Sequence, residues 1–145
     1  MNITNQEGNT GYLLYHLTMI LQRKMKRELD KLDITHTQFI VIATLYKLTK
    51  NSEAVTQIDI ANESKTDRMM VSKILRTLQE KGYVTRQEHL TDTRAKTISL
   101  TDNGRIVFQK AFIIVQQVGQ DFFKCLNEQT KPFNDILKII ISHNQ

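Results

Sequence analysis

The residues with the clearest chemistry are basic, and they are concentrated in one part of the chain. Between Lys65 and Lys96 the sequence contains eight lysines and arginines but only four acidic residues. This stretch therefore carries +4 of the net charge of +5 of the 145 residues. A concentration of cationic side chains in one part of a domain is typical of a surface that binds a polyanion such as nucleic acid.

The sequence contains no residue pattern for catalysis or for metal binding. The glycine-rich phosphate loop, the nucleophile elbow of hydrolases and the zinc-binding helix of metalloproteases are all missing. The single cysteine, Cys125, cannot form an intrachain disulfide, and the four histidines are too dispersed to suggest a metal site. We therefore predict a protein that is not an enzyme and that needs no cofactor or metal.

The composition predicts one mainly α-helical domain over residues 1–145. Hydrophobic residues make up 40% and charged residues 24% of the chain, which is typical of a folded globular protein. Five glycines and one proline are too few for a turn-rich β-architecture. The sequence has neither a signal peptide nor a long apolar run, so we expect a cytoplasmic protein.

Two helical segments follow each other closely within the basic stretch, which predicts a helix-turn-helix. The first spans Thr56 to Asn62, and a turn from Glu63 to Lys65 follows it. The second begins after Thr66 as its N-cap and runs to Lys81, where Gly82 ends it. Its apolar residues recur at helical spacing, so one narrow face is expected to be buried. These residues are Val71, Ile74, Leu75 and Leu78.

The opposite face of the second helix predicts contacts to double-stranded DNA. Arg68 is the candidate for reading a base edge, and Met69 for touching a thymine methyl group. Ser72, Lys73 and Arg76 suit phosphate or mixed contacts. Each of them alone is better explained as a solvated surface residue, but their clustering on exposed elements favours DNA binding. The expected contacts are Lys65, Thr66, Arg68, Met69, Ser72, Lys73 and Arg76.

A β-hairpin is expected directly after this helix, in the position of a wing. Two segments rich in β-branched residues, Tyr83 to Arg86 and Ala95 to Leu100, flank the polar run from Glu88 to Arg94. Arg94 at the tip has the length and charge to enter a narrow minor groove, where Asp92 could hold it in place. Arg86 and Lys96 are the other wing residues expected to contact DNA.

Long helices flank this lobe, which is expected to span about residues 35–100. The flanking regions, about 10–34 and 101–145, are rich in apolar residues. The expected helix starts are Thr35 or Thr37, Thr101 or Asp102, and Pro132. A string such as Ile136 to Ile141 is apolar on more than one side. It predicts a dimer built from the terminal helices, the alternative being a helix wrapped into its own core.

Two segments of the chain resemble winged helix-turn-helix regulators of the MarR family. Leu78 to Arg86 (LQEKGYVTR) matches the end of the recognition helix, and Asp92 to Gly104 (DTRAKTISLTDNG) matches the wing tip and its closing Leu-Thr before Gly. The order of elements is also similar from about Tyr12 onward. The resemblance implies a homodimer that binds a pseudo-palindromic operator in successive major grooves. It also implies transcriptional repression that is relieved by a small ligand or an oxidant.

The resemblance carries over to an effector site only in part. Peroxide-sensing relatives have a reactive cysteine near the start of the first long helix, where this chain has Tyr12, Tyr15 and His16. Cys125 is instead expected to be a small, buried hydrophobic residue. His16 and His36 are candidates for lining a cavity that binds a small aromatic or phenolic effector, the alternative being ordinary core or surface histidines.

Two other functions are compatible with the same sequence. A winged-helix protein-interaction module would dock its basic face on an acidic partner. A nonspecific architectural DNA-binding protein would contact phosphates alone, which would favour lysine throughout. The mixture of Arg68, Met69 and Ser72 argues against the second of these.

Overall fold

The computed structural model describes residues 7–52, 54–88 and 96–145 and confirms the predicted mainly α-helical fold with a two-stranded wing. The two strands are antiparallel, with Val84 opposite Leu100 and Glu88 opposite Lys96. The elements are α1 (Thr10–Leu29), η1 (Asp30–Leu32), α2 (His36–Thr49), α3 (Gln57–Ser64), α4 (Arg68–Glu80), β1 (Val84–Glu88), β2 (Lys96–Leu100), α5 (Asp102–Phe123), η2 (Lys124–Gln129) and α6 (Thr130–His143).

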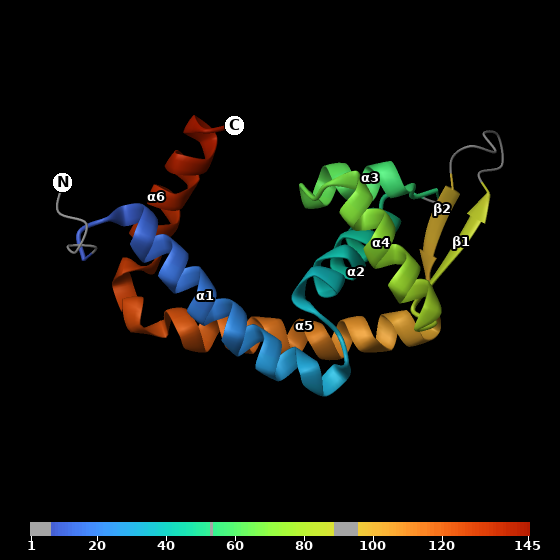
Figure 1. The fold of residues 1–145 in the computed structure, drawn as a ribbon, viewed down its shortest axis with the longest axis horizontal. Helices are drawn as coiled ribbons and strands as arrows, with labels where there is room; N and C mark the ends of the chain where they lie inside the picture. Colours follow the sequence, from blue (N-terminus) through green and yellow to red (C-terminus); the bar gives the residue numbers. More distant parts are fainter. Residues whose placement is uncertain (1–6, 53, 89–95) are drawn as a thin grey trace.

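The molecule consists of a winged-helix lobe and an elongated arm (Figure 1). The lobe contains α2, α3, α4 and the two strands, which gather at the N-terminal end of α5. Helix α1 runs beside α5, and α6 rises from the far end of α5. The start of α1 and the end of α6 both lie at this far end of the arm, away from the strands.

The hydrophobic core lies in the lobe and at its junction with the arm. Helix α4 buries the predicted apolar stripe of Val71, Ile74, Leu75 and Leu78. Of the arm, only Met25 and Leu29 of α1 and Gly104, Val107, Phe108 and Ala111 of α5 are buried. No residue of η2 or α6 is buried within the chain.

The arm leaves many large apolar side chains exposed. Leu14 and Tyr15 of α1, Ile113 of α5 and Ile139 of α6 are more than half exposed, and Ile139 reaches 68%. Within the described chain, the alternative that these helices wrap into their own core is therefore wrong. None of the described helices is both long and apolar enough to cross a membrane.

Helices α2, α3 and α5 begin at the capping residues that the sequence suggests. Thr35 and Thr56 each form a capping box, and Thr101 caps α5 with its side chain. The expected start of the last helix at Pro132 is wrong, because α6 begins at Thr130. Proline is tolerated at this third position since the first amide groups of a helix have no intrahelical acceptor.

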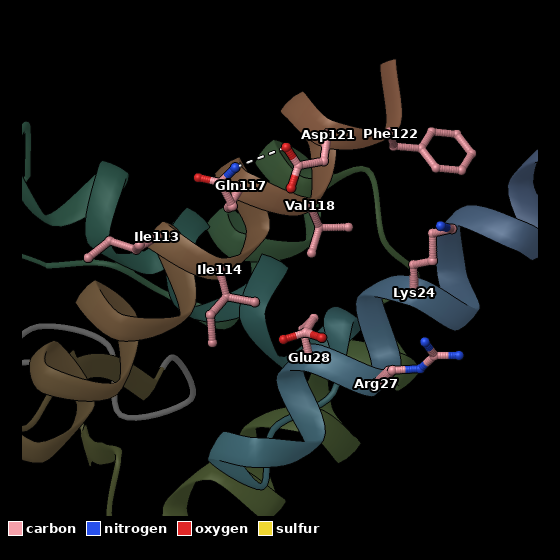
Figure 2. A pocket seen from close by; sticks show the side chains of 9 residues that line it. All are labelled: Lys24, Arg27, Glu28, Ile113, Ile114, Gln117, Val118, Asp121 and Phe122. Atoms are coloured by element: carbon pink, nitrogen blue, oxygen red, sulfur yellow. Dashed lines mark hydrogen bonds between the residues drawn. The ribbon is translucent and has the colours of Figure 1, made fainter. Parts of the chain in front are cut away.

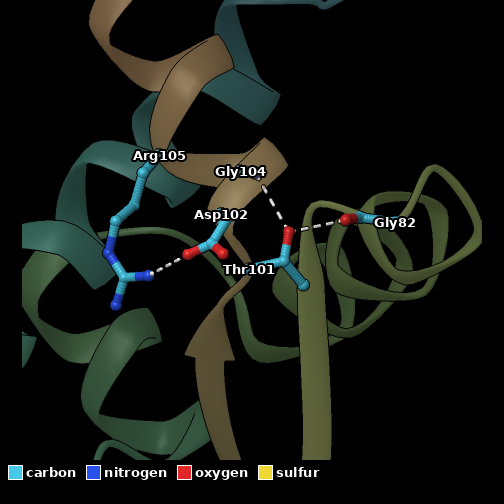
Figure 3. A network of polar contacts seen from close by, with 5 residues as sticks. All are labelled: Gly82, Thr101, Asp102, Gly104 and Arg105. Carbon is cyan, nitrogen blue, oxygen red and sulfur yellow. Dashed lines mark hydrogen bonds and ion pairs between the residues drawn. The ribbon is translucent and has the colours of Figure 1, made fainter.

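The start of α5 is hydrogen-bonded to the turn that follows α4 (Figure 3). Thr101 donates its hydroxyl to the Gly82 carbonyl oxygen at 2.6 Å and accepts from the Gly104 amide at 3.0 Å. A Cβ atom at Gly104 would lie 2.1 Å from the Tyr83 carbonyl oxygen. Only glycine therefore fits at residue 104 without a shift of the backbone.

Gly104→Ala should lower the free energy of unfolding by about 1–3 kcal/mol, because the added methyl group meets backbone rather than a movable side chain. Chemical denaturation measures this change. Asn103→Ala, at the preceding exposed position, is the control and should stay within about 0.5 kcal/mol. Since alanine favours helices over glycine, an unchanged or stabilised Gly104 variant would contradict the close packing.

Candidate nucleic-acid interface

Helix α4 has a buried face and an exposed face, and the exposed face contains the residues expected to contact DNA. Arg68, Met69, Lys73 and Arg76 are exposed, and Ser72 is half-buried. At 1.5 Å of rise per residue, these side chains lie within about 12 Å along the helix axis. The helix therefore presents three cations and one apolar side chain on a surface that the core leaves free.

Asp67, rather than the expected Thr66, is the N-cap of α4. The Asp67 Oδ1 atom accepts hydrogen bonds from the Met69 and Met70 amides at 2.9 and 3.1 Å. The expectation was wrong by one residue because a carboxylate satisfies two helix-start amides and interacts favourably with the helix dipole. The Thr66 hydroxyl instead donates to a carbonyl of the preceding turn.

The turn before α4 exposes a further cation. Lys65 ends α3 in the left-handed conformation with φ of 56°, and its side chain is exposed. Thr66 is half-buried. Of these two residues, only Lys65 therefore has a freely accessible side chain.

Two methionines, not one, are exposed at the start of α4. Met69 is 78% exposed, as its position on the helical wheel predicts. Met70, which is not among the expected DNA contacts, is 50% exposed. Both can contribute an apolar contact at the groove-facing end of the helix.

Arg86 on β1 is joined to the recognition helix. Its Nη2 atom donates to the Ser72 carbonyl oxygen at 3.1 Å, and its Nε atom is buried without a partner among the described residues. Burial and the nearby charge of Arg76 lower the pKa of Arg86. Arg86 therefore connects the wing to the middle of α4, a contact that sequence reasoning missed.

The structure describes the wing only at its base, up to Glu88 and from Lys96 onward. Lys96, the first residue of β2, is exposed. Arg94 and Asp92, the residues expected at the tip, lie outside the described residues. Ile98 donates its amide to the Val55 carbonyl oxygen at 2.8 Å, so β2 is also bound to the segment before α3.

The two candidate effector residues lie in different places. His16 is exposed in the first half of α1, about 20 Å along the helix from its last residue. His36 is half-buried at the start of α2 and stacks on Phe39 with ring centroids 6.4 Å apart. Neither of them lines the cavities described below.

Cys125 is exposed, so the expectation of a buried residue is wrong. It lies in η2, the segment between α5 and α6 that buries no residue within the chain. Its apolar sequence neighbours, Phe122 and Phe123, pack edge-to-face against each other. The sequence suggested burial because these neighbours are apolar, but the bend in the arm leaves the thiol outside the core.

Several cavities lie along α5, and two of them are also lined by α1 or α2. One, of about 530 Å³, separates α1 from α5, and Figure 2 shows Lys24, Arg27 and Glu28 of α1 facing it. Gln117 donates to Asp121 on its α5 side at 3.1 Å. Two cations and two carboxylates line this cavity, so its charge is balanced.

The second cavity, of about 710 Å³, lies between α2 of the lobe and α5 of the arm. Its lining includes the aromatic side chains of Phe39, Tyr46, Phe108 and Phe112, and the Tyr46 and Phe108 rings stack with centroids 4.5 Å apart. The Lys50 ammonium lies 4.6 Å from the centroid of the Tyr46 ring. Lys47 is paired with Glu63, and this hydrogen bond and charge lower the pKa of Glu63. Lys50 is thus a cation at the rim of an aromatic cavity.

Within residues 7–52, 54–88 and 96–145, no group of three histidine, cysteine or acidic side chains is arranged to hold a metal ion.

Comparison with known proteins identifies a family of regulators. Residues 30–127 match the ArnR1-like winged-helix domain. The uncharacterized HTH-type transcriptional regulator YdcH of Bacillus subtilis is 37% identical over 113 residues, which cover 78% of this chain and 77% of YdcH.

Solved structures show the same fold. The MepR–DNA complex of Staphylococcus aureus superposes with a TM-score of 0.85 at 26% identity, covering 93% of this chain and 98% of MepR. A mutant of MarR from Escherichia coli, complexed with operator DNA, has a TM-score of 0.84 at 22% identity. That comparison covers 97% of this chain and 99% of MarR.

The half-buried position of His36 predicts a pH dependence of stability. Burial lowers the pKa of His36 below its ordinary value of 6.5, so the unfolded chain binds a proton more readily than the folded chain does. The free energy of unfolding should therefore decrease as the pH falls through 6.5 and be fully retained above it. His36→Gln should remove part of this decrease in denaturation curves recorded at neutral and mildly acidic pH.

His143→Gln, in the exposed last turn of α6, is the matched control and should leave the pH dependence unchanged. Parallel pH dependences of the wild-type chain and His36→Gln would show that His36 is not the group responsible.

Proposed function

Because the chain belongs to the MarR family of winged helix-turn-helix transcriptional regulators, we propose that it is a homodimeric, sequence-specific repressor that binds double-stranded DNA. A small aromatic or phenolic effector releases the DNA in this proposal.

The observation that carries the proposal is the exposed face of α4. Arg68 and Met69 lie at the start of the helix, where side chains reach base edges, and Lys73 and Arg76 follow on the same face. This combination supports reading of sequence as well as binding of phosphates, because arginine pairs with guanine and methionine touches thymine methyl groups. Lys65 and Lys96 flank this face and add contacts to the DNA backbone.

A second copy of the chain covers the exposed apolar side chains of the arm in this proposal. Exposed apolar patches of this extent are rare on monomers, and most of these side chains lie on α1, α5 and α6, with Ile58, Met69 and Met70 the ones on the lobe. A twofold axis through the arm leaves the two lobes free. Two recognition helices about one helical turn of DNA apart then fit adjacent major grooves of an inverted repeat. Arg94 stays a predicted minor-groove contact of each wing.

The cavity between α2 and α5 is the proposed effector site. Its aromatic lining suits a planar ring, and Lys50 at the rim can pair with a carboxylate or phenolate. His36 does not line this cavity, but it stacks on Phe39, which does. The cavity lies between the lobe and the arm. An effector that binds more tightly when the lobe has a different orientation relative to the arm therefore favours that orientation, in which the dimer cannot bind DNA.

Selection of bound sequences from a random duplex pool, at about physiological salt, tests this function. We expect an inverted repeat whose half-sites are about 10 base pairs apart. If a folded dimer retains no sequence from the pool, the result contradicts the proposal and favours a protein-interaction module. If it binds unrelated sequences with equal affinity, the result favours an architectural DNA-binding protein.

Two substitutions on α4 should have different effects on DNA binding. Arg68→Ala should weaken binding to the selected site by about 1–3 kcal/mol and relax the preference at one base. Lys73→Ala should weaken binding to all sequences similarly and reduce the slope of log affinity against log salt by about one. Fluorescence anisotropy with matched and mismatched duplexes measures both effects. Lys110→Ala on α5 also removes one positive charge and is the control, which should bind DNA as the wild-type chain does. If Arg68→Ala and Lys73→Ala have identical effects, Arg68 and Lys73 do not have separate roles in base reading and phosphate binding.

Lys50→Met should weaken the binding of an aromatic acid about tenfold, because it removes one charge-assisted contact. Calorimetric titration with benzoic acid derivatives measures this effect. Lys110→Met should bind the same compounds as the wild-type chain does. Equal affinities of Lys50→Met and the wild-type chain would place the effector elsewhere.

A further inference from the structure

The end of the recognition helix is bound to the arm at two points, the α1–α2 junction and the start of α5. Lys81, the C-cap of α4, donates from its Nζ atom to the Asp33 carbonyl oxygen. The same ammonium lies 3.5 Å from the Asp33 Oδ2 atom. The Lys81 side chain is only 25% exposed, although Asp33 is 95% exposed. The lysine therefore lies against the surface at this contact instead of extending into solvent.

Asp33 is the junction between the arm and the lobe. It follows η1 at the end of α1 and precedes α2, and its φ of 52° places it in the left-handed region. Few residues other than glycine adopt this conformation. Its amide donates to the Asp30 carbonyl oxygen at 3.0 Å, which ends the helical path of the arm. Unpaired carbonyl groups at a helix end attract a cation, and Lys81 supplies one.

The other side of the same turn is bound to α5. The Thr101 hydroxyl donates to the Gly82 carbonyl oxygen at 2.6 Å, and the Thr101 amide donates to the Tyr83 carbonyl oxygen at 3.1 Å. Residues 81–83 thus connect α4 to α5 on one side and to the α1–α2 junction on the other (Figure 3 shows the α5 side). On the α5 side, the close packing of Gly104 against the Tyr83 carbonyl oxygen fixes the position of the turn. The contact at Asp33 is made by a lysine side chain, so it can be changed without altering the backbone packing.

We propose that Lys81 is a positioning residue for DNA recognition, whose contact with Asp33 fixes the angle between α4 and α1. In a dimer held together by the arms, this angle sets the distance between the two recognition helices. The inference rests on the proposed function, because only a two-lobed dimer has such a distance. Lys81 itself need not contact DNA for this role.

A spacer scan with the full-length chain tests the inference. The probes are the inverted repeat selected by the wild-type chain, the same repeat with one or two base pairs inserted or removed between half-sites, and a duplex with one half-site. Each base pair changes the half-site separation by about 3.4 Å, so a rigid dimer binds one spacing best. Melting curves first establish that every variant is folded.

Lys81→Met should bind the single half-site as the wild-type chain does but discriminate less between spacings. We expect the ratio of affinities for the best and the altered spacing to fall about three- to tenfold. Lys81→Arg keeps a donor for the Asp33 carbonyl oxygen and should restore the wild-type ratio. Lys110→Met removes the same charge elsewhere and should leave the ratio unchanged.

Three results would overturn the inference. If Lys81→Met keeps the wild-type spacing preference, the Asp33 contact does not position α4. If Lys81→Met weakens half-site and full-site binding equally, Lys81 is an ordinary DNA contact. If the wild-type chain itself binds all spacings equally, the two-lobed dimer of the proposed function fails, and the inference fails with it.

Discussion

The buried stripe of α4 is the constraint on which the rest of this structure depends. Val71, Leu75 and Leu78 are fully buried and Ile74 is almost so, and this fixes which side of the helix faces outward. Rotation of α4 about its axis would bring Lys73 or Arg76 into the core, where an unpaired charge costs several kcal/mol. The packing of apolar side chains therefore determines which residues are available to DNA. The same core holds α3 and the strands around this helix.

The arm follows a different physical rule from the lobe. The lobe buries most of its apolar side chains internally, whereas α6 buries none of its side chains within the chain. In a single chain, the isoleucines of the arm remain in contact with water, and this exposure of apolar surface is unfavourable. In the proposed dimer, a second copy removes this surface from water and at the same time brings two lobes together. Stability of the arm and recognition of a symmetric DNA site then have the same physical origin.

Local sequence patterns were sufficient for the lobe. The spacing of Val71, Ile74, Leu75 and Leu78 predicted the buried face of α4, and the β-branched segments predicted the wing, because these signals depend on near neighbours in the chain. The N-cap of α4 was missed because Thr66 and Asp67 both favour that position. The exposed face of α4 follows from the same periodicity, so most of the candidate site could be predicted.

Contacts between distant segments could not be predicted. Lys81 and Asp33 are 48 residues apart, and no periodicity relates them. The exposure of Cys125 depends on the bend between α5 and α6, and the cavity beside Lys50 depends on how α2 meets α5. His16 and His36 were paired by family resemblance alone, whereas the chain places them on separate elements. Tertiary geometry decides each of these features.

Affinity cleavage of the selected duplex tests the central claim most directly. An iron chelate attached at position 69, in a Met69→Cys variant that also carries Cys125→Ser, places the reagent on the exposed face of α4. The account predicts two clusters of strand cleavage in the major groove, about one helical turn apart. A single cluster would show that one lobe acts alone, and even cleavage along the duplex would show that α4 does not read sequence. Either result would contradict a dimer that recognises DNA through two α4 helices.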